Sequence, residues 1–354
     1  MENPYANIEK LLAAGQNVIL ARIVGQVGSA PRSIGTACLI LEDGSIKGTI
    51  GGGCLELQVL EKAKDVFIKG KTEILHFKLT GKEIAQMEML CGGIVDVYLE
   101  PIASENRGAG DLFGKIADSL KKGQSGRLMT LVADGIASDS SECRCFIAQD
   151  CTETGTIGPV TAAERKQLDA MLESRKPQLW ESETAGRAVF LESIEPDHVL
   201  YLFGAGHICT FVAPLAKLVG FRVAVIDDRE EFANQERFSS ADEIIVGPFL
   251  DAFDRISISA NAYIAIVTRG HLHDRDVLKA ALQTDATYIG MIGSRRKRNI
   301  IYQSLMEEGV SEARLKQVHS PIGADIGGET PEEIAISIVA ELISERSSVQ
   351  NSKR

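Results

Sequence analysis

Apolar and polar positions follow different patterns in the two halves of the chain. In the second half, short apolar runs alternate with segments whose apolar residues recur at helical spacing. The apolar runs are residues 198–203, 222–227, 243–246, 262–268 and 288–292. The helical segments are roughly residues 208–219, 274–283, 295–308 and 331–345. Regular alternation of strands and helices predicts a parallel sheet with right-handed crossovers.

The first half combines hairpins with interspersed helices. Asp43-Gly44 separates two apolar runs, residues 36–41 and 46–50, and this arrangement favours a hairpin. Apolar positions at helical spacing in residues 55–69 predict a helix that ends at Gly70. Further predicted elements are strands at 17–24, 73–79, 94–100, 127–133 and 144–149 and a helix at 111–122. This mixture predicts an α+β domain.

A polar and charged stretch separates the two patterns. The chain has 354 residues, more than the ~250–300 at which single cores stop growing, so we expect two domains. Residues 161–187 are polar and charged and contain one helical stretch, and the strand–helix alternation begins just after Pro196. The predicted parts are an N-terminal α+β domain at residues 1–160, a connecting region at 161–195, a C-terminal α/β domain at 196–346 and a flexible tail at 347–354.

Composition narrows the class of protein. Hydrophobic residues make up 44% and charged residues 25% of the chain, as in ordinary globular proteins. A formal net charge of -11 disfavours non-specific nucleic-acid binding, which depends on neutralising phosphates. The sequence shows neither a ~20-residue apolar run nor a basic N-terminal region, so we expect no membrane span and no signal peptide. Seven scattered cysteines fit reduced thiols, and we expect a cytoplasmic protein.

A glycine turn follows the first apolar run of the second half. Gly204-Ala205-Gly206 stands between residues 199–203 and a helical segment, so its backbone N–H groups can face a phosphate at the helix N-terminus. This context predicts a Rossmann-type, doubly wound sheet. Asp227 and Asp228 end the second run, where a carboxylate suits a ribose diol. Cys209 replaces the third glycine of the fingerprint, and an empty turn in a parallel α/β fold is the alternative.

Two further segments are expected at the same edge of the sheet, because the loops after the first and fourth strands flank the point where the strand order reverses. Thr268–Asp274 is one segment, and Arg295–Arg298, a run of four cations at a helix start, is the other. These cations oppose the helix dipole unless an anion binds or they face solvent, and both alternatives stay open. The candidate ligand contacts are His207, His271, Arg295 and Arg296. A lesser alternative is a metal site made of His207, His271, His273 and Asp274.

A second glycine cluster precedes the first helical segment of the N-terminal half. Gly51, Gly52 and Gly53 expose backbone N–H groups, and they place Cys54 at a helix N-terminus, where a thiolate is favoured. Soft thiolates suit soft metal centres, so Cys54 is the candidate metal ligand and reactive group. Cys91, beside two glycines, is a second candidate, although a buried structural thiol is equally expected there. Three more cysteines lack a fourth zinc ligand at a standard spacing and are expected to be structural: Cys143, Cys145 and Cys151.

Taken together, these residues resemble the xanthine dehydrogenase accessory family, XdhC and CoxI. The motifs that carry the resemblance are Gly25–Arg32, Gly51–Glu56, Gly204–His207, Val225–Arg229, Thr268–His271, Ile289–Lys297 and Ser320–Ala335. They span nearly the whole chain, and residues 105–195 are the least distinctive part. The resemblance implies a role in the maturation of molybdenum hydroxylases, in which the protein binds the molybdopterin cofactor, protects it while its sulfido ligand is installed and hands it to the apo-enzyme.

The expected protein is therefore a cofactor-binding chaperone, with the pterin phosphate on a glycine turn and Cys54 near the molybdenum. Its expected partner is an apo xanthine dehydrogenase-type molybdoenzyme, with a cysteine desulfurase as a further candidate. A homodimer is expected because two-fold oligomers are common. Family members are often labelled xanthine dehydrogenase subunits, but this chain shows no cysteine set suited to 2Fe–2S clusters, so we do not expect it to oxidise purines itself.

Two other functions stay open. An NAD(P)-dependent oxidoreductase would bind its nucleotide at Gly204, Gly206 and Asp227 and would use His271 for acid–base catalysis. A pure assembly scaffold would carry a vestigial Rossmann domain. Cys209 in the fingerprint and the unexplained Gly51–Cys54 element argue against the oxidoreductase.

Overall fold

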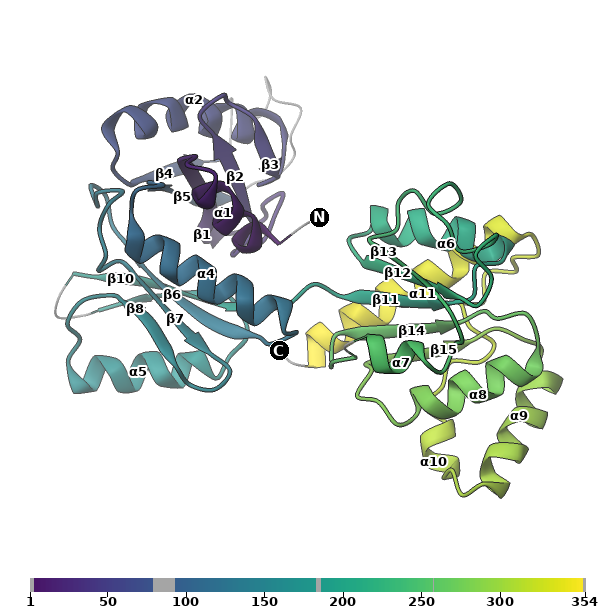
Figure 1. Ribbon diagram of the computed structural model, residues 1–354. Helices are drawn as coiled ribbons and strands as arrows, with labels where there is room; N and C mark the ends of the chain where they lie inside the picture. Colours follow the sequence, from purple (N-terminus) through teal and green to yellow (C-terminus); the bar gives the residue numbers. More distant parts are fainter. Residues whose placement is uncertain (1–2, 79–92, 183–185, 257, 353–354) are drawn as a thin grey trace. The chain divides into compact units, whose positions relative to one another are not determined.

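The computed structural model describes residues 3–78, 93–182, 186–256 and 258–352. The chain forms two compact units, one that runs to Pro196 and one that starts at Asp197. Figure 1 labels their helices and strands. Each unit buries its apolar side chains in hydrophobic cores of its own.

Two five-stranded antiparallel sheets form the N-terminal unit (Figure 1). The first sheet has the order β3 (Ile46–Gly48), β2 (Ala37–Leu41), β1 (Val18–Val27), β5 (Ile94–Ile102) and β4 (Glu73–Lys78). The second has the order β8 (Glu153–Thr156), β7 (Arg144–Ala148), β6 (Gly126–Val132), β10 (Ala188–Ile194) and β9 (Gln178–Glu181). The turn at Asp43-Gly44 joins β2 to β3, so the predicted hairpin is confirmed.

Helices lie between and outside these two sheets (Figure 1). α1 (Pro4–Ala13) and α4 (Arg107–Lys121) pack between the sheets, in a core that takes side chains from both. α2 (Gly53–Lys69) covers the outer face of the first sheet, and α5 (Ala162–Leu172) covers the outer face of the second. The N-terminal unit is therefore layered, and the glycine–cysteine motif lies where α2 begins.

Residues 161–195 differ from the connecting region that the sequence predicts. They contain α5, β9 and β10, and β10 is an interior strand of the second sheet. The polar composition has a physical reason, because α5 buries few side chains, chiefly Leu168, and β9 is a four-residue edge strand. A capping box between Thr161 and Glu164 starts α5. These residues thus complete the N-terminal unit.

The C-terminal unit is a five-stranded parallel sheet with helices on both faces. Its strand order is β13 (Glu243–Val246), β12 (Arg222–Asp227), β11 (Val199–Phe203), β14 (Ala262–Ile266) and β15 (Tyr288–Met291). α6 (His207–Leu218) and α11 (Pro331–Ser352) pack on one face. The other face carries α7 (Ala252–Arg255), α8 (His271–Ala281), α9 (Arg295–Glu307) and α10 (Glu312–Leu315). The predicted fold class, a Rossmann-type doubly wound sheet with an N-terminal α+β domain, is confirmed.

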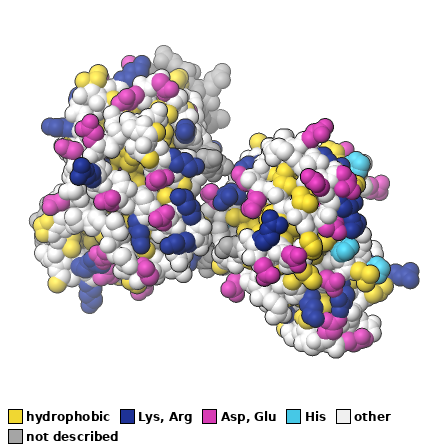
Figure 2. Space-filling view, viewed as in Figure 1, with side chains coloured by type: hydrophobic (Ala, Val, Ile, Leu, Met, Phe, Trp, Pro, Cys, Tyr) yellow, Lys and Arg dark blue, Asp and Glu magenta, His cyan; other side chains and the backbone are white. Residues whose placement is uncertain are grey.

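Two further features concern the ends and the surface of the chain. α11 continues to Ser352, so the expected tail at 347–354 is helical through that residue. Figure 2 shows Lys and Arg side chains interspersed with Asp and Glu side chains on the visible face of each unit. Within the described ranges, no helix is both long and apolar enough to cross a membrane.

Candidate functional site

The glycine turn lies at the switch point of the parallel sheet. β11 lies between β12 and β14, and the helices that follow β11 and β14, α6 and α8, pack on opposite faces of the sheet. Gly204 has φ +120°, and a Cβ there would collide with the carbonyl of Val267 after β14, so only glycine fits. Gly206 caps α6 without a side-chain bond, and a Cβ there would have no atom within 4 Å. The turn is therefore tightly fixed at Gly204 and open at Gly206.

Both carboxylate oxygens of Asp227 are engaged. Oδ2 accepts the backbone N–H of Ala205 at 2.8 Å and Nη2 of Arg229 at 3.1 Å. Oδ1 accepts the backbone N–H of Arg229 at 3.1 Å and its Nε at 2.9 Å. Burial raises the pKa of Asp227, but these hydrogen bonds outweigh burial and hold the pKa below its ordinary value. Asp227 therefore braces the glycine turn as a buried, charged carboxylate.

A second ion pair spans the end of β11. Asp228 follows β12 and Arg269 follows β14, and Oδ2 of Asp228 lies 2.7 Å from Nη2 of Arg269. β11 lies between these two strands, so the pair joins the loops on either side of the glycine turn. Arg229 and Arg237 both lie over the ring of Phe232, with guanidinium carbons 3.8 Å and 4.9 Å from its centroid. Arginines thus surround the turn.

Cys209 is a packing residue. It is fully buried in the core between α6 and the sheet, and burial raises the pKa of its thiol to about 12. A small side chain there permits the close contact between helix and strand that the third glycine of the fingerprint usually allows. The departure from the fingerprint is therefore compatible with the fold.

Asp274 joins the starts of two helices. Its Oδ1 accepts the hydroxyl of Thr268 at 2.6 Å and the backbone N–H of Thr268 at 3.1 Å. Its Oδ2 pairs with Nζ of Lys297 in the first turn of α9. The side chain is fully buried, so this carboxylate supports the loops structurally.

The metal site proposed at the histidine loop is wrong. Asp274 is engaged by Thr268 and Lys297, and His273 packs against Phe249 with ring centroids 5.5 Å apart. His207 and His271 are exposed at the first residues of α6 and α8. Among the residues that the structure describes, no group of three or more His, Cys, Asp and Glu side chains is placed to hold a metal ion.

The run of cations at the start of α9 divides into two pairs. Lys297 meets the buried Asp274, and Arg298 donates to the carbonyl of Ser320 at 3.0 Å. Arg295 and Arg296 are exposed, and neither has a hydrogen bond or ion pair to another described residue. An internal anion thus offsets part of the unfavourable charge, and the first two arginines stay available to a ligand.

In the N-terminal unit, Cys54 follows a glycine loop whose preceding residues are held by hydrogen bonds to Glu56. Gly51, Gly52 and Gly53 have φ of +136°, +73° and +61°, a run that favours glycine. Glu56 Oε2 accepts the hydroxyl of Thr49 at 2.7 Å and the N–H of Ile50 at 3.3 Å. Cys54 is partly buried in the first turn of α2, which has no side-chain cap.

Other family motifs meet this loop. A Cβ on Gly51 would lie 3.1 Å from Cβ of Pro31, and a Cβ on Gly93 would collide with the carbonyls of Val27 and Ser29. The Gly25–Arg32 motif therefore packs beside the Gly51–Gly53 loop and the start of β5. Cys91 lies outside the described residues.

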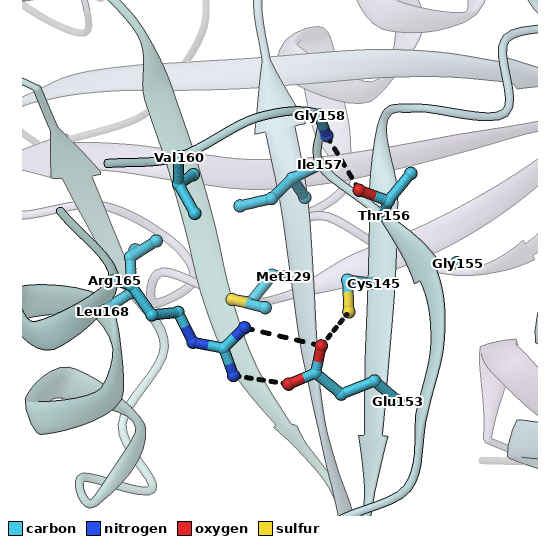
Figure 3. Close-up of a pocket in the computed structure, with 10 residues that line it drawn as sticks. All are labelled: Met129, Cys145, Glu153, Gly155, Thr156, Ile157, Gly158, Val160, Arg165 and Leu168. Carbon is cyan, nitrogen blue, oxygen red and sulfur yellow. Dashed lines mark hydrogen bonds and ion pairs between the residues drawn. The ribbon is translucent and has the colours of Figure 1, made fainter. Parts of the chain in front are cut away.

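The three cysteines that resemble zinc ligands are separated by their environments. Cys143 and Cys145 are buried, and burial raises the pKa of both thiols, that of Cys145 to about 11. Cys151 is exposed. A hollow of about 60 Å³ lies beside Cys145, between α5 and the second sheet (Figure 3). Arg165 and Glu153 fill its polar side with an ion pair, and Cys145 Sγ lies 3.9 Å from Glu153 Oε2. This hollow is distant in sequence from every family motif and holds an internal ion pair.

The structure therefore assigns the predicted residues to two places. One group lies at the carboxyl edge of the parallel sheet, where Arg295 and Arg296 begin α9. It consists of Gly204, Gly206, His207, Asp227, Asp228 and His271. Gly51, Gly52, Gly53 and Cys54 belong to the other unit. The sequence analysis did not identify Arg229, Arg269 and Glu56 as residues that hold these sites in place. The adjacency of Asp227, Asp228 and Arg229 was the available signal, because a cation two residues after a carboxylate can fold back onto it.

The fold and these two glycine motifs define a two-unit α/β protein with a Rossmann-type C-terminal unit. The sequence profile of the XdhC Rossmann domain matches residues 200–342, and the profile of the XdhC and CoxI family matches residues 11–78. The chain belongs to the XdhC and CoxI family, so the resemblance seen in its motifs is confirmed.

Relatives match almost the full length of the chain. A probable xanthine dehydrogenase subunit of Bacillus subtilis (strain 168) is 27% identical over 351 residues, 99% of each chain. The molybdenum cofactor insertion chaperone PaoD of Escherichia coli (strain K12) is 22% identical over 341 residues, which are 95% of this chain and 85% of PaoD. A solved structure described as a xanthine dehydrogenase from Bacillus halodurans has a TM-score of 0.77 and 27% identity, and covers 97% of this chain and 96% of that chain.

Proposed function

We propose that this chain is an accessory protein that binds the molybdenum cofactor and supports the maturation of a xanthine dehydrogenase-type molybdenum hydroxylase. The pinned Gly51–Gly53 loop carries the proposal, because it presents the Cys54 thiol beside backbone that has no side chains. The names of two relatives support it, since one is a molybdenum cofactor insertion chaperone and the other a probable xanthine dehydrogenase subunit.

The loop fits the chemistry of such a ligand. A Cβ on Gly52 would meet nothing within 4 Å, so the space above the backbone is open. The uncapped first turn of α2 offers backbone N–H groups to an anion, and Cys54 offers a soft sulfur donor. The bound cofactor supplies the soft, sulfur-bearing metal centre. Glu56 holds Thr49 and Ile50, and thereby keeps Cys54 at the open side of the loop.

The C-terminal edge of the parallel sheet supplies the second part of the proposal. Gly206, His207, Arg295 and Arg296 are open to solvent or partly so, and we propose that this edge of the C-terminal unit is by itself an anion-binding site. Gly204 sets the shape of the turn. In this proposal Asp227 and Asp228 act by bracing the turn, because their carboxylates are already paired.

Cofactor binding is measured by mixing the purified chain with molybdenum cofactor released from a molybdoenzyme. Molybdenum is then quantified by mass spectrometry and pterin by fluorescence after separation. We expect micromolar binding by the wild type and binding at least about tenfold weaker by Cys54→Ser, because serine offers a harder donor. Cys151→Ser, which removes an exposed thiol from another part of the unit, is the matched control and should bind normally.

Two outcomes would contradict the proposal. Failure of the wild type to bind at micromolar cofactor would remove the cofactor-handling function. Equal binding by Cys54→Ser and the wild type would show that Cys54 does not contribute to cofactor binding.

The apo-molybdoenzyme as partner is part of the same proposal. The homodimer, the cysteine desulfurase contact and the cytoplasmic location stay predictions.

A further inference from the structure

Each of the two carboxylates at the end of β12 faces an arginine. In a dinucleotide-binding Rossmann fold, a carboxylate at this position accepts hydrogen bonds from the ribose diol. The sequence offers Asp227 and Asp228 for that role. We propose that Arg229 and Arg269 are specificity-determining residues that close this turn to nicotinamide dinucleotides.

Asp227 has no acceptor left for a ribose hydroxyl. A carboxylate has about four lone-pair sites. The backbone N–H of Ala205 and three N–H groups of Arg229, one from its backbone and two from its side chain, donate to the two oxygens at distances from 2.8 to 3.1 Å. Only 1% of the residue is exposed. A diol could reach this carboxylate only by displacing the Arg229 side chain.

Asp228 is enclosed by a different geometry, with one oxygen paired and the other buried. Its Oδ2 lies 2.7 Å from Nη2 of Arg269, which comes from the loop after β14. Its Oδ1 is buried and accepts no hydrogen bond from a described residue, and Nε of Arg229 lies 3.8 Å away, beyond hydrogen-bond distance. The same two arginines therefore face both oxygens of Asp228.

Arg229 is also held on its other side. Its guanidinium carbon lies 3.8 Å from the centroid of the Phe232 ring, where a cation is attracted to the aromatic face. Displacement by a ribose would break this contact as well as the hydrogen bonds to Asp227. The ligand of the turn is consequently one that needs no carboxylate acceptor for a sugar diol. This inference does not depend on the identity of the ligand bound by Cys54.

Titration of NADH and NADPH, followed by nucleotide fluorescence, tests the assignment. The wild type should show no saturable binding at micromolar nucleotide. Arg229→Ala releases the two side-chain bonds on Asp227, one on each oxygen, so we expect NADH to bind at least about tenfold more tightly than to the wild type. The double variant Arg229→Ala/Asp227→Ala should lose the gain, because the acceptor itself is removed.

Arg222→Ala is the matched control, since Arg222 is an exposed cation at the opposite end of β12. It should bind NADH as poorly as the wild type. Thermal unfolding checks that each variant is folded, and Arg229→Gln replaces Arg229→Ala if the latter does not fold. Saturable micromolar binding of either nucleotide by the wild type would overturn the proposal. So would a folded Arg229 variant, combined with Arg269→Ala, that gains no NADH binding.

Discussion

Cys151 has a backbone conformation that rarely suits a side chain. Within the described ranges it is the one residue other than glycine with positive φ, at 65°. It is exposed in the turn between β7 and β8, after Asp150. Left-handed backbone with a Cβ costs about 1–2 kcal/mol relative to glycine.

Glycine at this position should therefore stabilise the protein. We expect Cys151→Gly to raise the free energy of unfolding by up to about 1 kcal/mol, because strain relief exceeds the entropy that glycine adds to the unfolded chain. Urea denaturation of the two proteins measures the difference. Cys151→Ala keeps the Cβ and should give no gain, and a gain equal to that of glycine would show that the thiol, rather than the backbone, was the cause.

Arg22 gave no signal in the sequence, because it stands alone in an apolar strand. The structure buries it completely, with Nη2 3.3 Å from Glu100 and Nη1 paired with Glu192. Arg144 lies 2.6 Å from the other oxygen of Glu100. These residues come from β1 and β5 of the first sheet and from β7 and β10 of the second, so a buried ionic network ties the sheets together.

Removal of Arg22 should strongly destabilise the N-terminal unit. Arg22→Met leaves Glu192 without a buried counter-charge and leaves Glu100 with Arg144 alone, and loss of one partner of such a pair costs about 3–5 kcal/mol. Denaturant unfolding measures the change. Arg175→Met breaks the more exposed pair with Glu195 and should cost at most about 1 kcal/mol. A loss for Arg22→Met no larger than this control would contradict the structural role of the network.

At the scale of elements, burial on both faces explains which strands the sequence revealed. β11, β12 and β14 are almost entirely buried, so they appear as continuous apolar runs. β9 escaped prediction because it is a four-residue strand that buries one side chain fully and is otherwise largely polar. The pairing of Asp274 with Lys297 was equally hidden, since helical periodicity does not show which charges face each other across two helices.

A histidine–carboxylate pair fixes the C-terminal helix to the sheet edge. His319 pairs with β15 through its backbone, and its Nδ1 lies 3.1 Å from Oε1 of Glu341 on α11. The hydrogen bond to Glu341 raises the pKa of His319 despite burial. Burial raises the pKa of Glu341, but bonds from His319, Tyr288 and Gly323 outweigh it and lower that pKa.

The pair should make stability depend on pH. The contribution of His319 is complete below its ordinary pKa of 6.5 and is lost as pH rises through its raised folded value. The contribution of Glu341 is complete above its ordinary pKa of 4.5 and is lost as pH falls through its lowered folded value. The pair therefore stabilises the fold most between these two ordinary values.

Thermal unfolding of the wild type and His319→Gln from about pH 6 to about pH 9 measures this effect, because histidine loses its charge in that interval. We expect the melting temperature of the wild type to fall toward that of the variant as pH rises. His207→Gln removes an exposed histidine and should leave the profile unchanged. A constant difference between His319→Gln and the wild type at all pH values would contradict the argument.

At the scale of the whole molecule, the change of periodicity near residue 196 revealed an α+β part and an α/β part, and local motifs revealed both glycine loops. The engagement of Asp227 by Arg229 was beyond that reasoning, because the same tripeptide can present a free carboxylate or a closed one. Only the direction of the Arg229 side chain separates the two arrangements. The sequence therefore predicted the scaffold and the candidate residues, and the structure changed the roles of the charged ones.

The position of β10 also has a consequence for synthesis on the ribosome. This strand is the last of the N-terminal unit, yet it pairs with β6 on one side and β9 on the other, in the interior of its sheet. β6, β7 and β8 emerge first and have an open edge, which a nascent chain exposes to mispairing. The sheet closes only when Ile194 has left the exit tunnel, and Val199 of β11 follows directly. Folding of the two units therefore overlaps in time, and a translational pause just after β10 would favour closure of the first.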